Sequence, residues 1–251
     1  MLIATNQNGG SVSRLSSNHK LTGGRNFPSP QEVYKKRRLA GIEKEDTQVA
    51  KILRTNETNT NSAPVADVAK DHSSFIYDRT LGVRYTKTAH YIPVTVKAIQ
   101  KEKVVSTLKL FPGYGDAGDT HNGFAEINKS LKDYEHEDLL PFKTGIEAGA
   151  DGIMVSHIII KSLDPKLPAS LSSTVHKLLR RRLDYNGLII SDDLQMGAIT
   201  QYTKLHHTNA DILALKAGNY LLLGGNYKNR IPAINKQLKI KRYQKSKLTS
   251  Q

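Results

Sequence analysis

The chain has 251 residues, of which 38% are hydrophobic, and it contains no cysteine, which excludes disulfides and cysteine-ligated metals. This length suits one large domain, such as an α/β barrel of about 250 residues, and no apolar run approaches the ~20 residues of a membrane-spanning helix. The net charge of +14 and the mean hydropathy of −0.47 fit either a solvated basic surface or attraction to a polyanion.

The positive charge is concentrated in three blocks, at residues 35–38, 180–182 and 228–247. Aromatic residues do not interleave with these blocks, as a base-stacking surface would require, so no nucleic-acid partner is expected. A basic nucleic-acid binder is a rival function that the charge alone supports. Residues 236–251 are predicted to be a basic, disordered tail. The first fifteen residues lack the basic start and apolar centre of a signal peptide, which makes the cytoplasm the default location.

Secondary structure is predicted to begin with a short strand and a turn at Gly9-Gly10, followed by a polar stretch, 16–62, that looks the least ordered. Within that stretch, 48–53 is a modest helical candidate. From residue 63 onwards, short β-rich apolar runs alternate with amphipathic helical patterns. Six strands are predicted in all, near residues 2–5, 61–65, 104–110, 152–157, 187–191 and 220–223.

Three helices are predicted between these strands. The first, 138–148, has Pro141 in its first turn, where a missing N–H costs little. The second, 173–183, is capped by Ser172 or Ser173, and the third, 208–217, ends at Gly218. Alternation of strand and helix at intervals of about 35 residues predicts a parallel α/β sheet.

Five polar residues lie at or just past the predicted carboxyl ends of strands, where parallel α/β folds bind their ligands. They are Lys109, Asp119, His121, His157 and Asp192. No single one of them makes the argument; their convergence on one rim of the sheet does.

Asp119 and His121 are two residues apart, which in an extended segment puts both side chains on one side. A carboxylate beside an imidazole fixes the tautomer of the ring and favours its protonated form. Such a histidine can donate a proton to a leaving oxygen and later take one from water. The alternative is a surface loop with two polar residues.

Asp192 follows the apolar strand 187–191 and could attack an electrophilic carbon or bind a cation. Asp193 would point the other way if the strand continued. The alternative for Asp192 is the N-cap of a helix, a position that aspartate favours.

Two other sites are considered and set aside. The segment Gly113–Gly118 formally matches the dinucleotide-binding fingerprint, but Pro112 precedes it and no apolar helix follows. The nine histidines include no i, i+4 pair with a glutamate, so neither a metal nor another cofactor is expected.

Several ordered motifs make the chain similar to family 3 glycoside hydrolases, in the β-N-acetylhexosaminidase branch. The Lys109–His121 segment resembles the Lys-His-Phe-Pro-Gly…Asp-(Ser/Thr)-His signature, and Ser191–Met196 resembles the nucleophile strand. The similarity covers roughly residues 1–235, which we take as the barrel-like domain. The other matching segments are Ala4–Leu15, Asn61–Val68, Ser74–Gly82, Ile153–His157, Pro168–Ser172 and Leu215–Asn219.

The resemblance implies a retaining glycosidase that cleaves β-linked N-acetylglucosamine from cell-wall or chitin-type oligosaccharides. Asp192 would be the nucleophile, His121 the acid/base and Asp119 its partner, which departs from the usual pair of carboxylates. The implied sugar-binding residues are Arg14, Arg79, Lys109, Asn6 and His157. Asn6 and Leu110 nevertheless replace the family's usual aspartate and histidine, at an expected cost of ~1–3 kcal/mol per lost interaction.

The resemblance also implies a TIM-type (β/α)8 barrel, and the match begins at the family's third strand. An incomplete barrel without the first two β/α units is therefore expected, and a truncated, catalytically impaired homologue that at most binds sugar is the alternative function. A β-glucosidase is a second alternative, against which the Asp119–His121 loop argues. The expected partner is a carbohydrate, and the oligomeric state is left open.

Overall fold

The computed structural model describes residues 1–225 and 227–248, and its centre is a parallel sheet in the order β1-β4-β5-β7-β9. A parallel bridge between Ile190 and Leu221 places the predicted sixth strand beside β9. The strands are β1 (Ala4–Thr5), β4 (Thr60–Asn61), β5 (Val105–Phe111), β7 (Gly152–Val155) and β9 (Leu188–Ser191).

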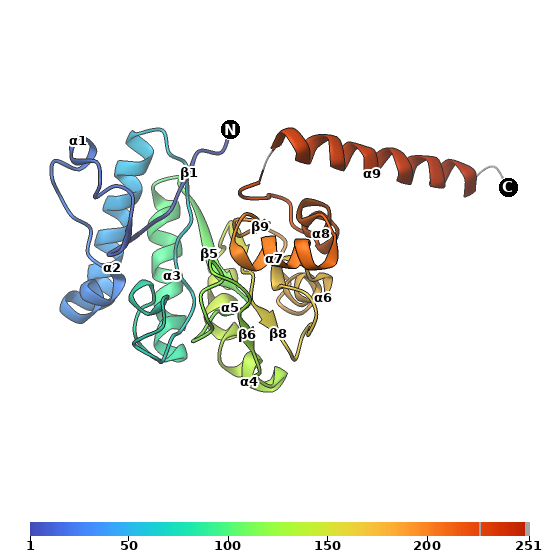
Figure 1. Ribbon diagram of the computed structural model, residues 1–251. Helices are drawn as coiled ribbons and strands as arrows, with labels where there is room; N and C mark the ends of the chain where they lie inside the picture. Colours follow the sequence, from blue (N-terminus) through green and yellow to red (C-terminus); the bar gives the residue numbers. More distant parts are fainter. Residues whose placement is uncertain (226, 249–251) are drawn as a thin grey trace.

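The sheet curls into a half-barrel, with helices packed outside it (Figure 1). The prediction of an incomplete (β/α)8 barrel is thereby confirmed for the described residues. The register pairs Thr60 with Val105, Thr107 with Gly152, and Gly152 with Leu188. Because all five strands run the same way, their carboxyl ends form one edge of the sheet.

Helices follow the strands in alternation, and α2, α3 and α5 pack against one another in turn around the outside (Figure 1). The predicted helices are confirmed as α5, as α6 with η3, and as α8; Ser172 caps α6, and α8 ends at Gly218. The helices that pack around the sheet or follow it are α2 (Pro30–Thr55), α3 (Tyr85–Lys101), α5 (Leu139–Glu147), α6 (Ser173–Lys177), η3 (Leu178–Arg182), α7 (Gly197–His206), α8 (Ala210–Ala217) and α9 (Tyr227–Leu248).

The remaining elements are short. β2 (Gln7–Gly9) and β3 (Val12–Ser13) form an antiparallel hairpin around the predicted Gly9-Gly10 turn. β6 (Glu126–Ile127) pairs with β8 (Ile159–Ile160) in loops that follow β5 and β7. The others are α1 (His19–Thr22), α4 (Leu131–His136), η1 (Tyr77–Arg79) and η2 (Ala169–Leu171).

The expectation that residues 16–62 are the least ordered was wrong for α2, which is 26 residues long and bends at Arg38. A capping box begins this helix: the Glu32 backbone N–H donates to Ser29 Oγ, and the Ser29 N–H donates to Glu32 Oε2. Pro30 occupies the first helical position. The inner face packs through a row of buried residues, Val33, Ile42, Val49, Ala50 and Leu53.

α9 extends as far as Leu248, into the segment 236–251, whose assignment as a basic, disordered tail stays a prediction; residues 249–251 lie outside the described residues. α9 runs out from the rest of the molecule (Figure 1). Arg230 anchors its start, donating Nε to Asp211 Oδ1 at 2.6 Å and Nη1 to the Leu222 carbonyl at 3.1 Å. A domain boundary at residue 235 stays a prediction. Among the described helices, none is long and apolar enough to cross a membrane.

The main hydrophobic core lies between the sheet and its outer helices. Phe142 of α5 meets Phe111 of β5 edge to face, with 5.2 Å between ring centroids. Gly145 allows α5 to approach β5, since a Cβ there would lie 2.6 Å from the Leu108 side chain. Close packing of these elements holds the strand ends, and hence the polar groups beyond them, in fixed positions.

We expect Asp46 of α2 to make the protein less stable as the pH rises. Burial raises the pKa of Asp46 from 3.8 to about 7, the Thr95 side chain opposes this rise, and the nearby Glu45 charge adds to it. The folded state therefore holds an extra proton between roughly pH 4 and 7, so the free energy of unfolding falls as the pH rises through that window.

Urea unfolding at pH 4.5 and pH 8 measures the effect. Asp46→Asn should reduce the difference between the free energies of unfolding at the two pH values, and it should stabilise the protein at pH 8. Asp78→Asn, at an exposed aspartate of η1, is the control and should leave the difference unchanged. An Asp46→Asn protein with the wild-type pH dependence would contradict the prediction.

Candidate active site

The polar residues predicted at strand ends gather at the carboxyl edge of the half-barrel. Lys109 lies near the end of β5, and Asp192 directly follows β9. His157 lies just beyond β7, and Asn6 just beyond β1. The Asp119–His121 segment belongs to the long loop after β5.

Asp119 and His121 form a hydrogen-bonded dyad. Nδ1 of His121 lies 2.6 Å from Oδ1 of Asp119, and the His121 backbone N–H donates to the same oxygen at 2.9 Å. The side chain of His121 is 59% exposed and that of Asp119 is 29% exposed. Because Asp119 engages Nδ1, Nε2 is the nitrogen through which this imidazole can exchange a proton with a ligand.

The dyad segment is docked on the first turn of α7, the helix that follows Asp192. The Gly197 N–H donates to the His121 carbonyl at 3.1 Å, and the Ala198 N–H donates to the Thr120 carbonyl at 3.0 Å. Gly197 lies five residues after Asp192, so their Cα atoms are at most about 18 Å apart even if the chain between them is fully extended. The dyad and Asp192 therefore belong to the same part of the edge.

The charges of the two groups act on the same neighbours. Asp119 and Asp192 both raise the pKa of Tyr114 and both counter the fall that burial causes in the pKa of Arg79. His121 and Asp192 both act on buried His157, with opposite effects on its pKa. Asp119, His121 and Asp192 therefore have neighbours in common at this edge of the sheet.

Lys109 is a buried cation, only 1% exposed, whose Nζ donates to Asn6 Oδ1 at 2.6 Å. Burial lowers the pKa of Lys109 well below its usual value, and the positive charge of Arg79 lowers it further. The carboxylates of Asp192 and Asp67 act in the opposite direction. Lys109 thus sits within the electrostatic reach of the candidate nucleophile.

Asp67 is a site residue that the sequence prediction missed. It is 2% exposed, and its carboxylate accepts the Leu110 N–H at 2.7 Å and the Tyr114 N–H at 2.6 Å. Burial raises the pKa of Asp67 to about 7, although these hydrogen bonds and the charge of Arg79 lower it. Its signal was a single carboxylate in the apolar run 61–69, which belongs to one of the matched motifs.

His157 is 1% exposed, and both of its ring nitrogens are bonded within the protein. Nδ1 lies 2.7 Å from Ser170 Oγ, and Nε2 lies 2.9 Å from the Asp193 carbonyl. Burial lowers the pKa of His157, so a neutral ring donates from Nε2 to that carbonyl. In this arrangement His157 supports the segment that carries Asp192, and its predicted contact with sugar stays a prediction.

Two further positions complete the comparison with the sequence. Arg14 is exposed after β3, and its charge contributes to the lowered pKa of Lys109, which places it at the rim of the site. Leu110 is 3% exposed and belongs to the hydrophobic core. The sequence prediction had noted Leu110 in place of a sugar-binding histidine, and here that side chain packs into the protein.

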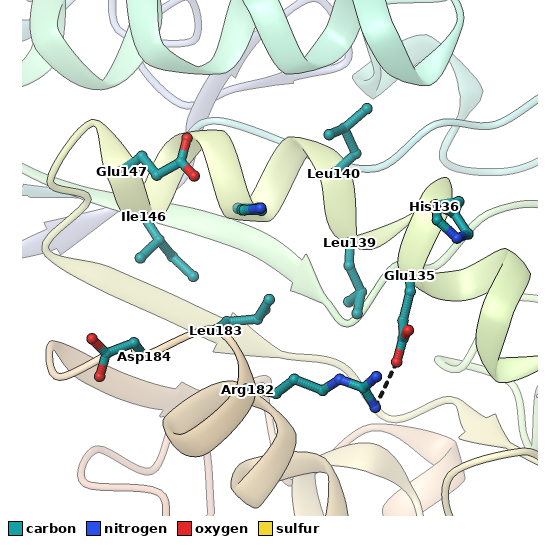
Figure 2. Close-up of a pocket in the computed structure, with 10 residues that line it drawn as sticks. Glu135, His136, Leu139, Leu140, Ile146, Glu147, Arg182, Leu183 and Asp184 are labelled. Carbon is teal, nitrogen blue, oxygen red and sulfur yellow. Dashed lines mark ion pairs between the residues drawn. The ribbon is translucent and has the colours of Figure 1, made fainter.

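A separate groove of about 680 Å³ lies between α4, α5 and η3, on the helical outside of the sheet (Figure 2). Leucine and isoleucine side chains line it, and Arg182 pairs with Glu135 across it at 2.7 Å. None of the eight predicted site residues lines this groove. The chemistry predicted from the sequence is therefore concentrated at the strand ends and not here.

Comparison with known proteins identifies the family of the chain. The model of the glycosyl hydrolase family 3 N-terminal domain matches residues 1–250. The chain belongs to glycosyl hydrolase family 3. A beta-hexosaminidase of Nitrosomonas eutropha is 31% identical over 226 residues, which cover 89% of this chain and 64% of that protein. One of Xanthomonas oryzae is 30% identical over 201 residues, which cover 79% and 60%.

Solved family 3 structures share the fold. A beta-N-acetylglucosaminidase from Paenibacillus superposes with a TM-score of 0.83 at 27% identity, covering 94% of this chain and 44% of that one. A family member from Mycobacterium smegmatis gives 0.83 at 28% identity, covering 95% and 74%. The chain spans about three fifths of the length of the curated relatives it matches.

We expect Gly197→Ala to displace the dyad of this family 3 domain. A Cβ at position 197 would lie 2.4 Å from the His121 carbonyl oxygen, a contact that forces backbone to move. Repacking of this kind typically costs about 1–3 kcal/mol in stability. NMR of the His121 ring and urea unfolding together measure the two effects.

Gly118→Ala, in the loop that carries the dyad, is the control, since its Cβ would meet only Ala125 Cβ at 3.9 Å. It should leave the His121 resonances and the stability near those of the wild type. Wild-type His121 resonances in Gly197→Ala would mean that the contact with α7 does not set the position of the dyad.

Proposed function

We propose that this chain is a retaining glycoside hydrolase that cleaves β-linked N-acetylglucosamine from cell-wall or chitin-type oligosaccharides. The observation that carries the proposal is the Asp119–His121 dyad, docked on the helix that begins five residues after Asp192. The curated relatives, each named a beta-hexosaminidase, support the substrate class.

In the proposed first step, a carboxylate oxygen of Asp192 attacks the anomeric carbon while the bond from that carbon to the leaving oxygen breaks. His121 donates its Nε2 proton to the departing oxygen, and the imidazolium charge is stabilised by Asp119. A covalent glycosyl-enzyme ester results, with the sugar inverted once.

In the second step, water attacks the same anomeric carbon and the ester bond to Asp192 breaks. His121 takes a proton from that water through Nε2, which regenerates both groups. The second inversion restores the original configuration. Lys109 and Arg79 lie near Asp192, whose negative charge counters the fall that burial causes in the pKa of both side chains.

We expect Asp192→Asn to abolish hydrolysis of 4-nitrophenyl β-N-acetylglucosaminide, because an amide cannot form the ester intermediate. Removal of a catalytic nucleophile lowers kcat by a factor of up to about 10⁶. Release of 4-nitrophenol measures kcat, and proton NMR of the first-formed sugar establishes whether the anomeric configuration is retained.

Asp193→Asn is the neighbouring control. The Asp193 side chain accepts the Gln195 N–H at 2.8 Å, which an asparagine oxygen can also do, so most of the activity should survive. Robust activity in Asp192→Asn, or an inverted product from the wild type, would refute the proposed mechanism. Preference for the matching aryl β-glucoside would favour a β-glucosidase.

A sugar-binding module without turnover is the second candidate, and two side chains favour it. Leu110 is packed in the core, and Asn6 uses its oxygen to accept the Lys109 ammonium. Neither side chain therefore makes the hydrogen bond to a sugar hydroxyl that is expected of the histidine and the aspartate usual in the family. Isothermal titration with N-acetylglucosamine oligomers that shows binding, together with no release of 4-nitrophenol, would establish this alternative.

A further inference from the structure

The loop between β5 and the dyad is organised around the phenol of Tyr114. This side chain is 1% exposed and among the largest that are fully buried. Its hydroxyl lies 2.8 Å from the Gly118 carbonyl and accepts the Thr120 N–H at 2.8 Å, with Thr120 Oγ1 at 3.0 Å. One oxygen therefore acts as donor and acceptor for the chain immediately before His121.

The other end of Tyr114 is fixed in the core. Its backbone N–H donates to Asp67 at 2.6 Å, and its ring meets Phe75 edge to face at 5.1 Å. Phe75 also meets the His121 ring edge to face, at 6.1 Å. The tyrosine is thus a rigid arm that extends from the end of β5 to the segment carrying the dyad.

Thr120 is held from two sides and is completely buried. Its N–H donates to the Tyr114 hydroxyl, and its carbonyl accepts the Ala198 N–H from α7 at 3.0 Å. The residues on either side of it are Asp119 and His121. Contacts that fix the backbone of Thr120 therefore also fix the backbone positions from which the side chains of Asp119 and His121 extend.

We propose that the Tyr114 hydroxyl is a positioning group, which places the imidazole of His121 for proton transfer to the leaving group. This inference rests on the proposed hydrolase function. The bonds inside the dyad join His121 to Asp119 but do not locate the pair relative to Asp192. That location comes from the anchors at Thr120 and at the start of α7.

The phenol keeps its proton at working pH. Burial raises the pKa of Tyr114 to about 12; the hydrogen bonds from Thr120 lower it, and the negative charges of Asp119 and Asp192 raise it. The hydroxyl can therefore donate to Gly118 and accept from Thr120 at the same time, at any pH where the dyad would act.

Tyr114→Phe tests the proposal, because it removes the hydroxyl and keeps the ring against Phe75. Misplacement of a catalytic group by about 1 Å can cost on the order of 10²-fold in rate. We expect kcat/KM for phenyl β-N-acetylglucosaminide to fall by a factor of roughly 10 to 100. For the 2,4-dinitrophenyl glycoside it should hardly change, since dinitrophenolate leaves without a proton.

Tyr134→Phe is the matched control. Tyr134 is also fully buried, and its hydroxyl donates to the Gly113 carbonyl at 2.7 Å, at the base of the same loop. It has no described bond to the segment 118–121. The two variants should shift the urea midpoint to a similar extent, but only Tyr114→Phe should discriminate between the two leaving groups.

Equal slowing of both glycosides in Tyr114→Phe, no slowing of either, or the same discrimination in Tyr134→Phe would each overturn the proposal. NMR of the His121 ring separates its failure from failure of the proposed function. If the wild type shows no hydrolysis, the proposed hydrolase function is rejected, and NMR still tests whether Tyr114 positions His121. A displaced His121 resonance in Tyr114→Phe alone supports it, and an unchanged resonance rejects it.

Discussion

Two backbone hydrogen bonds, from the first turn of α7 to the carbonyls of Thr120 and His121, hold the dyad segment against the helix that follows Asp192. The first N–H groups of a helix have no partner within it, so they are free to bind an outside carbonyl. Because α7 begins five residues after Asp192, the helix that binds the dyad loop is close in sequence to the candidate nucleophile. Gly197 permits the approach by having no side chain.

The buried charges add a second constraint to the same edge. Lys109 is nearly inaccessible to solvent and hydrogen-bonds a neutral partner, Asn6, so its compensating charges are the carboxylates of Asp192 and Asp67. A buried ion without an opposite charge is strongly unfavourable. The groups proposed for catalysis are therefore also groups that balance charge in the fold, and replacing any one of them changes the electrostatics of the others.

Much of the fold was predictable because its signals are local. Apolar runs gave the strands, and Ser172 and Gly218 marked helix ends. Only 48–53 of the α2 helix was predicted; its first eighteen residues were missed although Ser29, Pro30 and Glu32 form a capping box, because the apolar residues are spread among many charges. The contact of Gly197 with His121 and the bond of Tyr114 to Thr120 join residues brought together by tertiary packing, so no single segment could reveal them.

The half-barrel shows how separate strands contribute to one site. Asn6 beyond β1, Lys109 on β5, His157 beyond β7 and Asp192 beyond β9 all lie at the same edge, and their order across it follows the strand order. The bond from Lys109 to Asn6 joins the β1 side to the centre, and the bond from His157 to the Asp193 carbonyl joins the centre to the β9 side. Since these hydrogen bonds cross the sheet, a change in the curvature of the sheet would alter the distance between Asn6 on the β1 side and Asp192 on the β9 side. The curvature of the described strands is therefore itself part of what sets the geometry of the site.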